Sequence, residues 1–152
     1  MSDLPGLRRA PQDPTQRAIR GLQQAAADSA SARVLIVPGI TLTSQTAAIS
    51  TTNLVTLART GFYRVMAIAQ CTTADAGPLT LTVTIGWTDR VGATTDTGLT
   101  RNLAAQGRSS RSYELQVTGD THITYATSLS AAIGTAVYAL EIRVERVGGA
   151  AT

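Results

Sequence analysis

Apolar and polar residues alternate with a period of two along most of the chain after Arg33. The clearest example is Leu79–Trp87, where threonine or glycine separates a leucine, valine, isoleucine or tryptophan at every second position. Alternate side chains of a β-strand point to opposite faces, so this segment predicts a strand with one apolar face and one threonine face. Such a strand is typical of an antiparallel sheet that is buried on one side only.

The same pattern predicts seven further strands, separated by turns that contain glycine, threonine or aspartate. They are Val34–Val37, Ile40–Thr43, Asn53–Ala58, Phe62–Gln70, Arg111–Val117, Thr121–Thr127 and Ala136–Val147. No helical pattern lies between them, which favours an all-β antiparallel sandwich of the jelly-roll type over a fold that alternates strands and helices. We expect the sheet core to contain Tyr63, Val65, Leu81, Val83, Ile85, Trp87, Tyr138, Leu140 and Ile142.

One segment of the predicted sandwich, Thr88–Ser110, is long for a connection between strands and contains three glycines. Unstructured connections of more than about 12–15 residues are uncommon in compact domains. We therefore expect a further short strand inside it, at Leu99–Ala105.

The N-terminal part of the chain has a different pattern. Residues 1–12 are rich in proline and arginine and predict an extended arm. Asp13 is then placed as an N-cap, with Pro14 at the first helical position and Gln16 completing a capping box. These signals predict a helix that ends near Ala32.

The predicted helix has a narrow apolar face, formed by Ile19 and Leu22 and continued only by alanine. Such a helix is marginal in water and gains stability by lying on a surface, which is its own sheet, a symmetry-related copy or another protein. We expect an attachment segment 1–32, a sandwich domain 33–147 and a C-terminal tail 148–152. The alternative is an ordinary N-terminal helix packed on its own domain.

Composition limits the functions that the chain can perform. All 13 basic residues are arginine, which excludes every mechanism that needs a lysine. Threonine and alanine occur 24 times each while only 15% of residues are charged, which predicts a neutral, hydroxyl-rich surface. The net charge of +3 is modest and the arginines are scattered, so we expect no nucleic-acid partner. No apolar run approaches a bilayer span and no secretory signal is recognisable, so we expect no membrane partner.

Candidate reactive groups are few and isolated. His122 is the only histidine and Cys71 the only cysteine, which excludes an intrachain disulfide and zinc sites built from several of these residues. The aspartates fall beside glycine or threonine, where a carboxylate usually binds its own turn. A calcium site at Asp89 and Asp96 is an alternative, although the spacing of a calcium-binding loop is absent. We expect no catalytic residues, metal or cofactor, and hence no enzyme.

Four segments together resemble small virion structural proteins of tailed bacteriophages. They are Gly61–Val65 (GFYRV), Leu79–Asp89 (LTLTVTIGWTD), Ile123–Thr127 (ITYAT) and Tyr138–Val144 (YALEIRV). Their order is also similar to that in the trimeric globular heads of the complement and tumour-necrosis-factor class. The resemblance covers roughly residues 34–147, and it implies a homotrimer and a place on a virus particle, in the capsid, tail or fibre.

These observations lead us to expect a capsid decoration, or cement, protein that binds the assembled phage head as a homotrimer. Its partner would be the major capsid protein or another virion protein, and the chain would be made in the host cytoplasm. The alternatives are a tail-tip, head-spike or fibre module that binds a host receptor, and a hydrolase of host surface sugars. The expected partner-binding residues of the arm and helix are Arg8, Arg9, Arg17, Ile19, Arg20 and Leu22.

Overall fold

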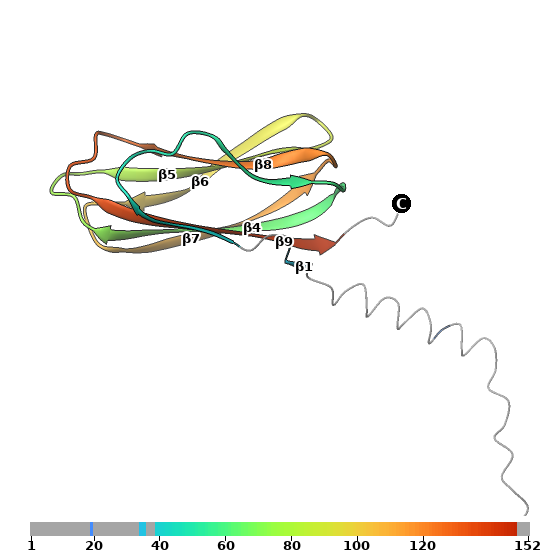
Figure 1. The fold of residues 1–152 in the computed structure, drawn as a ribbon, viewed down its shortest axis with the longest axis horizontal. Coiled ribbons are helices and arrows are strands. Elements are labelled where there is room, and N and C mark those ends of the chain that lie inside the picture. The colour runs from blue at the N-terminus through green and yellow to red at the C-terminus, as the bar shows by residue number, and fades with distance from the viewer. Residues whose placement is uncertain (1–18, 20–33, 36–38, 149–152) are drawn as a thin grey trace, which may run out of the picture. The chain divides into compact units, whose positions relative to one another are not determined.

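The computed structural model describes residues 19, 34, 35 and 39–148. The chain divides after Ala32 into two units, and almost all described residues belong to the second. In that unit, nine strands form two antiparallel sheets that face each other (Figure 1). The predicted all-β antiparallel sandwich is therefore confirmed.

Five strands form the first sheet, which we call sheet A. They are β1 (Val34–Leu35), β2 (Ile40–Gln45), β4 (Gly61–Thr73), β7 (Gly107–Val117) and β9 (Val137–Gly148). Their order is β1-β9-β4-β7, and β2 also pairs with β9. The other four strands form sheet B, in the order β3-β8-β5-β6. They are β3 (Thr52–Leu57), β5 (Thr80–Thr88), β6 (Ala93–Asn102) and β8 (Thr121–Leu129).

The predicted arm, most of the helix and the end of the C-terminal tail lie outside the described residues. Of the residues assigned to partner binding, Arg8, Arg9, Arg17, Arg20 and Leu22 lie outside them as well. Only Ile19 is described, and it has helical conformation and a half-exposed side chain. The attachment role of residues 1–32 therefore stays a prediction.

The core lies between the sheets and follows the period-two pattern of the strands. Of the nine residues assigned to it from the sequence, eight are buried: Tyr63, Val65, Leu81, Val83, Ile85, Tyr138, Leu140 and Ile142. Trp87 is only partly buried and packs against the margin of the core. It is the last inward-facing residue of β5, next to the end of the strand.

The segment between β5 and β7 corrects the sequence prediction. Instead of a long connection with one short strand at Leu99–Ala105, residues Ala93–Asn102 form a full strand, β6, which pairs with β5 along its length. The period-two pattern is faint here because the inward positions hold only one large apolar residue of the strand, Leu99. The alternating threonines of β6 carried no hydrophobic signal.

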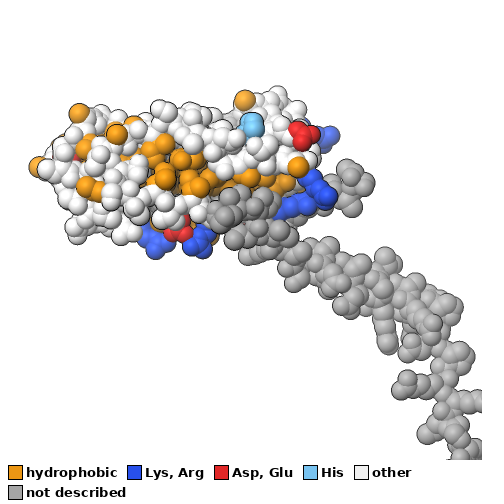
Figure 2. Space-filling view, viewed as in Figure 1, with side chains coloured by type: hydrophobic (Ala, Val, Ile, Leu, Met, Phe, Trp, Pro, Cys, Tyr) orange, Lys and Arg blue, Asp and Glu red, His pale blue; other side chains and the backbone are white. Residues whose placement is uncertain are grey.

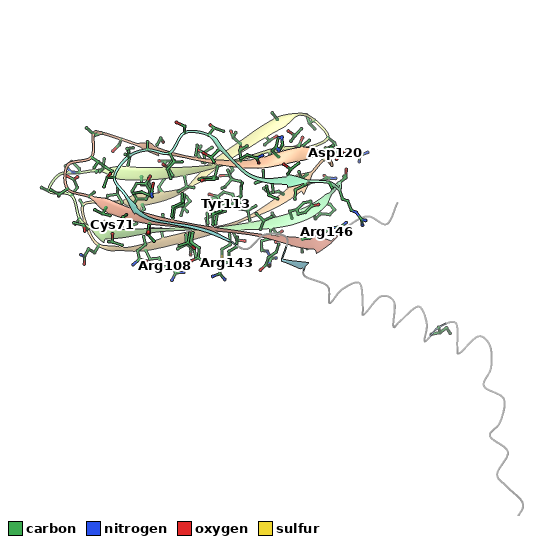
Figure 3. The ribbon with its side chains drawn as sticks, viewed as in Figure 1. Cys71, Arg108, Tyr113, Asp120, Arg143 and Arg146 are labelled. Atoms are coloured by element: carbon green, nitrogen blue, oxygen red, sulfur yellow. The ribbon has the colours of Figure 1, made fainter. Side chains whose placement is uncertain are left out.

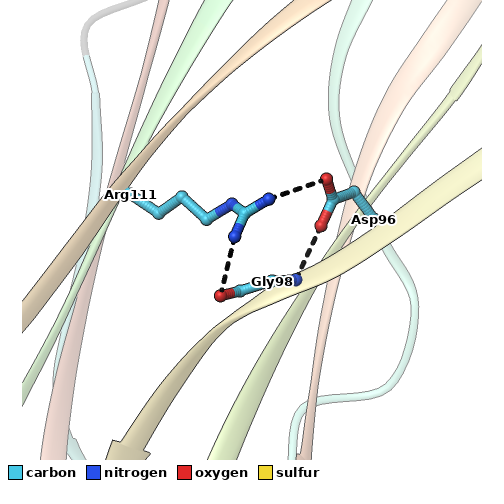
Figure 4. Close-up of polar contacts among 3 residues, drawn as sticks. All are labelled: Asp96, Gly98 and Arg111. Carbon is cyan, nitrogen blue, oxygen red and sulfur yellow. Dashed lines mark hydrogen bonds and ion pairs between the residues drawn. The ribbon is translucent and has the colours of Figure 1, made fainter.

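A polar bridge closes the edge of the sandwich where β6 and β7 meet (Figure 4). Nη2 of Arg111 lies 3.2 Å from Oδ2 of Asp96, and Nη1 donates a hydrogen bond of 3.2 Å to the carbonyl oxygen of Gly98. The amide of Gly98 donates in turn to the other oxygen of Asp96. A Cβ atom at position 98 would occupy the place of the Arg111 guanidinium group, so a larger residue here requires this flexible side chain to move and the bridge to break.

A buried hydrogen-bonded chain connects the two sheets at the opposite edge. The amide of Ile49 donates to Oγ1 of Thr127, which lies 3.0 Å from the hydroxyl of Tyr138, and this hydroxyl donates to the carbonyl of Ala47. Burial raises the pKa of Tyr138, so its hydroxyl stays protonated and keeps its donor role. The chain ties sheet A, sheet B and the β2–β3 connection together.

Candidate interaction surfaces

The loops at one end of the sandwich are held by a single carboxylate. Asp75 accepts hydrogen bonds from the amides of Gly77, Gly134 and Ala136, so it joins the β4–β5 and β8–β9 connections. These amide donors stabilise the charged form and lower the pKa of Asp75 below its usual value. The carboxylate of Asp75 thus has a structural role, which is to hold these two connections together.

The opposite end of the sandwich is formed by three turns, which we call the turn surface. They are the β3–β4 turn (58–60), the β5–β6 turn (89–92) and the β7–β8 turn (118–120). Backbone groups join them: Thr118 donates to the carbonyl of Thr88, and Asp120 donates to the carbonyl of Leu57. The amide of Gly119 also donates to the hydroxyl of Thr60. The three turns therefore form one continuous surface.

Further hydrogen bonds fix two of the three turns. The buried Tyr63 donates a hydrogen bond of 2.6 Å to the carbonyl of Arg59 in the β3–β4 turn. Asp89 accepts hydrogen bonds from the amides of Val91 and Gly92, and these donors lower its pKa below the usual value. Gly92 has a φ of 144°, which a residue with a side chain rarely adopts. The side chains on the turns are therefore presented from a fixed backbone.

The turn surface combines two exposed arginines, the exposed carboxylate of Asp120 and one large exposed apolar side chain. Arg59 and Arg90 are exposed, and Val91, in the β5–β6 turn, has 96% of its surface accessible. Figure 3 shows Asp120 and Arg146, the latter near the end of β9, at the same end of the sandwich. Among the residues that the structure describes, none forms an ion pair with Arg59, Arg90 or Arg146.

The outer face of sheet A, which we call the charged face, is formed by the residues that alternate with the core positions along each strand. Its central strand presents Phe62 and Met66, which are 54% and 39% exposed. Arg64 between them lies 2.9 Å from Glu114 of β7, and Arg143 of β9 pairs with Glu141. Arg108 and Arg143 point away from the core on this side (Figure 3). Both charges and exposed apolar groups occur on this face.

The outer face of sheet B, which we call the hydroxyl face, has a different chemistry. Its outward positions on β5 hold Thr80, Thr82 and Thr84, next to Thr100 of β6 and Ser128 of β8 in the pairing register. The described residues of this face include one ionisable side chain, His122, whose Nδ1 lies 3.0 Å from Asn53 and 2.9 Å from Thr56. This histidine belongs to a polar cluster on a sheet face, with no carboxylate or cysteine among those partners.

Partly buried aliphatic side chains follow the open edge of the sandwich between β2 and β3, opposite the Arg111 bridge. We call this the apolar seam, and Figure 2 shows hydrophobic side chains gathered between the two layers on this side. Its members are Ile40 and Leu42 of β2, Ile49 of the connection, and Leu54 and Val55 of β3.

No arrangement of catalytic or metal-binding type is found among the described residues. They hold no group of three or more histidine, cysteine, aspartate or glutamate side chains that could bind a metal ion. Asp96, one half of the alternative calcium site, instead binds the amide of Gly98 and pairs with Arg111. Cys71 is buried, and burial raises the pKa of its thiol, which disfavours the reactive thiolate. No described helix has the length and apolar character needed to cross a membrane.

The sequence prediction missed the turn surface and the exposed part of the charged face. Phe62 and Met66 break the alternation of β4, because they occupy outward positions beside the inward Tyr63 and Val65. Large apolar residues at outward positions of a strand indicate an exposed apolar surface, so this feature was predictable from the sequence. Arg59 and Arg90 gave no such signal, since they are far apart in the sequence and only the strand order brings their turns together.

Comparison with known proteins gives a limited result. No family model and no curated protein matches the chain. Among solved structures, it is similar to the CBM22-1 xylan-binding domain of Xyn10C from Paenibacillus barcinonensis, with 15% identity, 74% coverage of both chains and a TM-score of 0.47. It is also similar to the CBM22-1 and GH10 modules of the xylanase Xyn10B from Clostridium thermocellum, with 10% identity and a TM-score of 0.44. That match covers 75% of this chain but 22% of the xylanase chain. Neither similarity carries an argument about function.

Proposed function

We propose that this protein is a structural component of a bacteriophage virion, a decoration protein that binds the assembled head as a homotrimer. The trimer and the virion setting come from the sequence resemblance. The observation that supports the assembly of several copies is the apolar seam, because one edge of the sandwich is closed by the Arg111–Asp96 bridge while the other exposes part of its aliphatic side chains. Continuous apolar surface of this kind marks interaction sites.

The second copy of the chain is the partner that fits the seam best. Interfaces between identical subunits are more apolar than those of transient complexes, and the five seam residues carry no charge. The charged face and the turn surface, in contrast, carry charges that a permanent apolar contact would have to desolvate. In the proposed trimer the seam is buried and the other surfaces stay available.

A non-enzymatic role is part of this proposal. Its support is the use of five of the seven described carboxylates: Asp75 and Asp89 fix loops, Asp96 closes an edge, and Glu114 and Glu141 pair with arginines. A glycosidase needs two carboxyl groups that face each other across a substrate. Groups already committed to structural contacts do not favour such chemistry.

We expect the full-length protein to have three times its chain mass of 15.8 kDa in light scattering. Three matched arginine substitutions locate the contact: Leu54→Arg in the seam, Met66→Arg on the charged face and Thr82→Arg on the hydroxyl face. We expect only Leu54→Arg to reduce the mass to that of one chain, because it places a charge in the subunit contact.

Circular dichroism of each variant separates loss of assembly from loss of folding. If Leu54→Arg does not fold, Ile40→Thr, which keeps a β-branched side chain on β2, replaces it in the seam. A wild-type protein that stays monomeric at all concentrations contradicts the homotrimer. A trimer that survives both seam variants and dissociates with Met66→Arg contradicts the seam as the contact.

Deletion of residues 1–32 tests the attachment to the head. The described sandwich has its own core, so we expect the truncated protein to remain folded and trimeric but to lose binding to heads purified from a phage that lacks this gene. Co-sedimentation with the heads measures the binding. Undiminished binding contradicts the attachment role, and a copy number of a few tens or fewer per particle, in place of hundreds, favours the tail or spike alternative.

A further inference from the structure

We infer that β7, the edge strand of sheet A, pairs with the β7 strand of a second copy of this chain. The two strands run antiparallel about a two-fold axis, and Arg108 of each copy stands opposite Glu114 of the other. The inference goes beyond the proposed function, because it adds a contact between trimers, and it rests on the proposed function only for the trimer itself.

The strand β7 is the most regular edge of the described sandwich. It pairs with β4 through 11 consecutive residues without a register shift, and no described strand pairs with its other side. The pairing of each of the edge strands β2, β3 and β6 contains a register shift, and β1 has only two residues. Bulges and short strands are usual means of preventing an edge from pairing with another chain, and β7 has neither.

Unpaired backbone groups along β7 supply the attraction. In an antiparallel sheet, every second residue of an edge strand directs its amide and carbonyl groups away from the neighbouring strand. A regular strand of this length offers an even row of donors and acceptors, which a second extended strand can satisfy. The strand contains no proline, so every residue keeps its amide donor.

The charges of β7 select a second copy of the same strand as the partner. Arg108 and Glu114 are both exposed and both lie on the charged face. If two β7 strands pair with Arg111 on the axis, residues equally distant from position 111 stand opposite each other. Arg108 then faces Glu114 twice, and Ser110 faces Ser112 twice. A shift by two residues in either direction removes both charge pairs, so this register is the favoured one.

Both charged residues are available for this contact. Arg108 forms no ion pair with any residue that the structure describes. Arg64 of the same chain binds Oε1 of Glu114 at 2.9 Å, but 75% of the Glu114 side chain is exposed. A carboxylate accepts several hydrogen bonds, so its Oε2 atom is free to accept from Arg108 of the second copy.

The third charge of the strand does not oppose the pairing. Arg111 lies on the axis, where two like charges directly opposite each other would be destabilising. Its guanidinium group instead turns toward β6 of its own chain, where it pairs with Asp96 at 3.2 Å and lies over the ring of Tyr113. Charges on an edge strand usually prevent pairing, whereas those of β7 are either compensated within the chain or complementary between copies.

The position of β7 lets one chain make both proposed contacts. The apolar seam lies at the opposite edge of the sandwich, so the seam can join three copies while β7 joins two, and together they link trimers into a net. The β7 contact buries serines and charged groups, not aliphatic ones. We therefore expect it to be weak in dilute solution and to form where neighbouring trimers are held close together on a head.

Cysteine crosslinking of the full-length protein tests the register. Opposite residues of paired strands have Cβ atoms about 4.5–5.5 Å apart, close to the reach of a disulfide. We expect a concentrated mixture of the Ser110→Cys and Ser112→Cys variants to give two-chain bands on a denaturing gel after mild oxidation. Each variant alone should give much less, because equal residues stand diagonally. The control is Gln70→Cys, exposed on β4 away from the edge, and Cys71 is buried in every variant.

Exchange of charges tests the complementarity. Arg108→Glu and Glu114→Arg each place like charges opposite each other twice, so we expect either variant alone to associate beyond the trimer roughly tenfold more weakly than wild type. A contact between one copy of each variant restores both opposite-charge pairs, so an equal mixture should associate as wild type does. Sedimentation at high concentration measures association. Circular dichroism checks folding, because Glu114→Arg also breaks the pair with Arg64.

The outcomes separate this inference from the proposed function. A wild-type trimer whose cysteine mixture gives no more crosslinking than Gln70→Cys overturns the β7 contact and leaves the proposed function standing. Failure of the mixed charge variants to associate overturns the register. A crosslink to a protein of the head, in place of the second chain, overturns the second copy as the partner. A monomeric protein whose cysteine mixture still crosslinks contradicts the proposed trimer and supports the β7 contact.

Discussion

Replacing Leu81 by alanine is expected to lower the free energy of unfolding by about 2–5 kcal/mol, the usual cost of a leucine-to-alanine change in a core. Leu81 is fully buried at an inward position of β5, which lies between β8 and β6 in sheet B. The substitution removes apolar contacts with the facing sheet and leaves a cavity that the paired strands cannot close. Denaturant unfolding at a fixed protein concentration measures the change, since assembly makes stability depend on concentration.

The matched control is Thr82→Ala, one residue further along the same strand. Thr82 points to the hydroxyl face, so we expect a loss of less than about 1 kcal/mol, mainly from the lower strand preference of alanine. The two substitutions differ only in which side of β5 they change. Equal losses would contradict the orientation of this strand, and with it the assignment of the threonine positions to an outer surface.

The orientation of β5 is also the part of the fold that the sequence predicts best. Strict alternation over Leu79–Trp87 left one register in which all large apolar residues share a face, and the structure has that strand at Thr80–Thr88. The strand β6 lacked this signal because its inward positions include Arg101, whose guanidinium group donates to the carbonyl of Ala105. At the edge of a sandwich an arginine can fill an inward position, which a hydrophobic pattern does not predict.

The candidate surfaces were less accessible to sequence reasoning than the core. A core residue is recognised by its own hydrophobicity, whereas a surface is defined by which turns and strands the topology brings together. Arg59 and Arg90 lie at the same end of the sandwich only because β3 and β5 both end there, where the β7–β8 turn is hydrogen-bonded to each. The tie between Asp75 and the distant Gly134 is likewise a product of strand order, although an Asx turn at Asp75 was predictable from its local sequence.

Tyr138→Phe is expected to lower the free energy of unfolding by about 1–3 kcal/mol, although it removes a single oxygen atom. Tyr138 is fully buried, and its hydroxyl lies between Thr127 of sheet B and the carbonyl of Ala47. Without it, the hydroxyl of the buried Thr127 loses its partner between the sheets, and the carbonyl of Ala47 loses its donor. The β2–β3 connection, which carries Ile49 of the apolar seam, is then held less firmly.

Tyr125→Phe is the matched control for this last substitution. Tyr125, which lies in β8 of sheet B, is also buried, but its hydroxyl makes no hydrogen bond to any residue that the structure describes. We therefore expect a change of less than about 0.5 kcal/mol. Thermal unfolding compares the variants, and light scattering shows whether the looser connection also weakens the proposed trimer. Similar stability of Tyr138→Phe and wild type would mean that the buried chain contributes no net stability, and that packing alone positions the β2–β3 connection and the seam residue it carries.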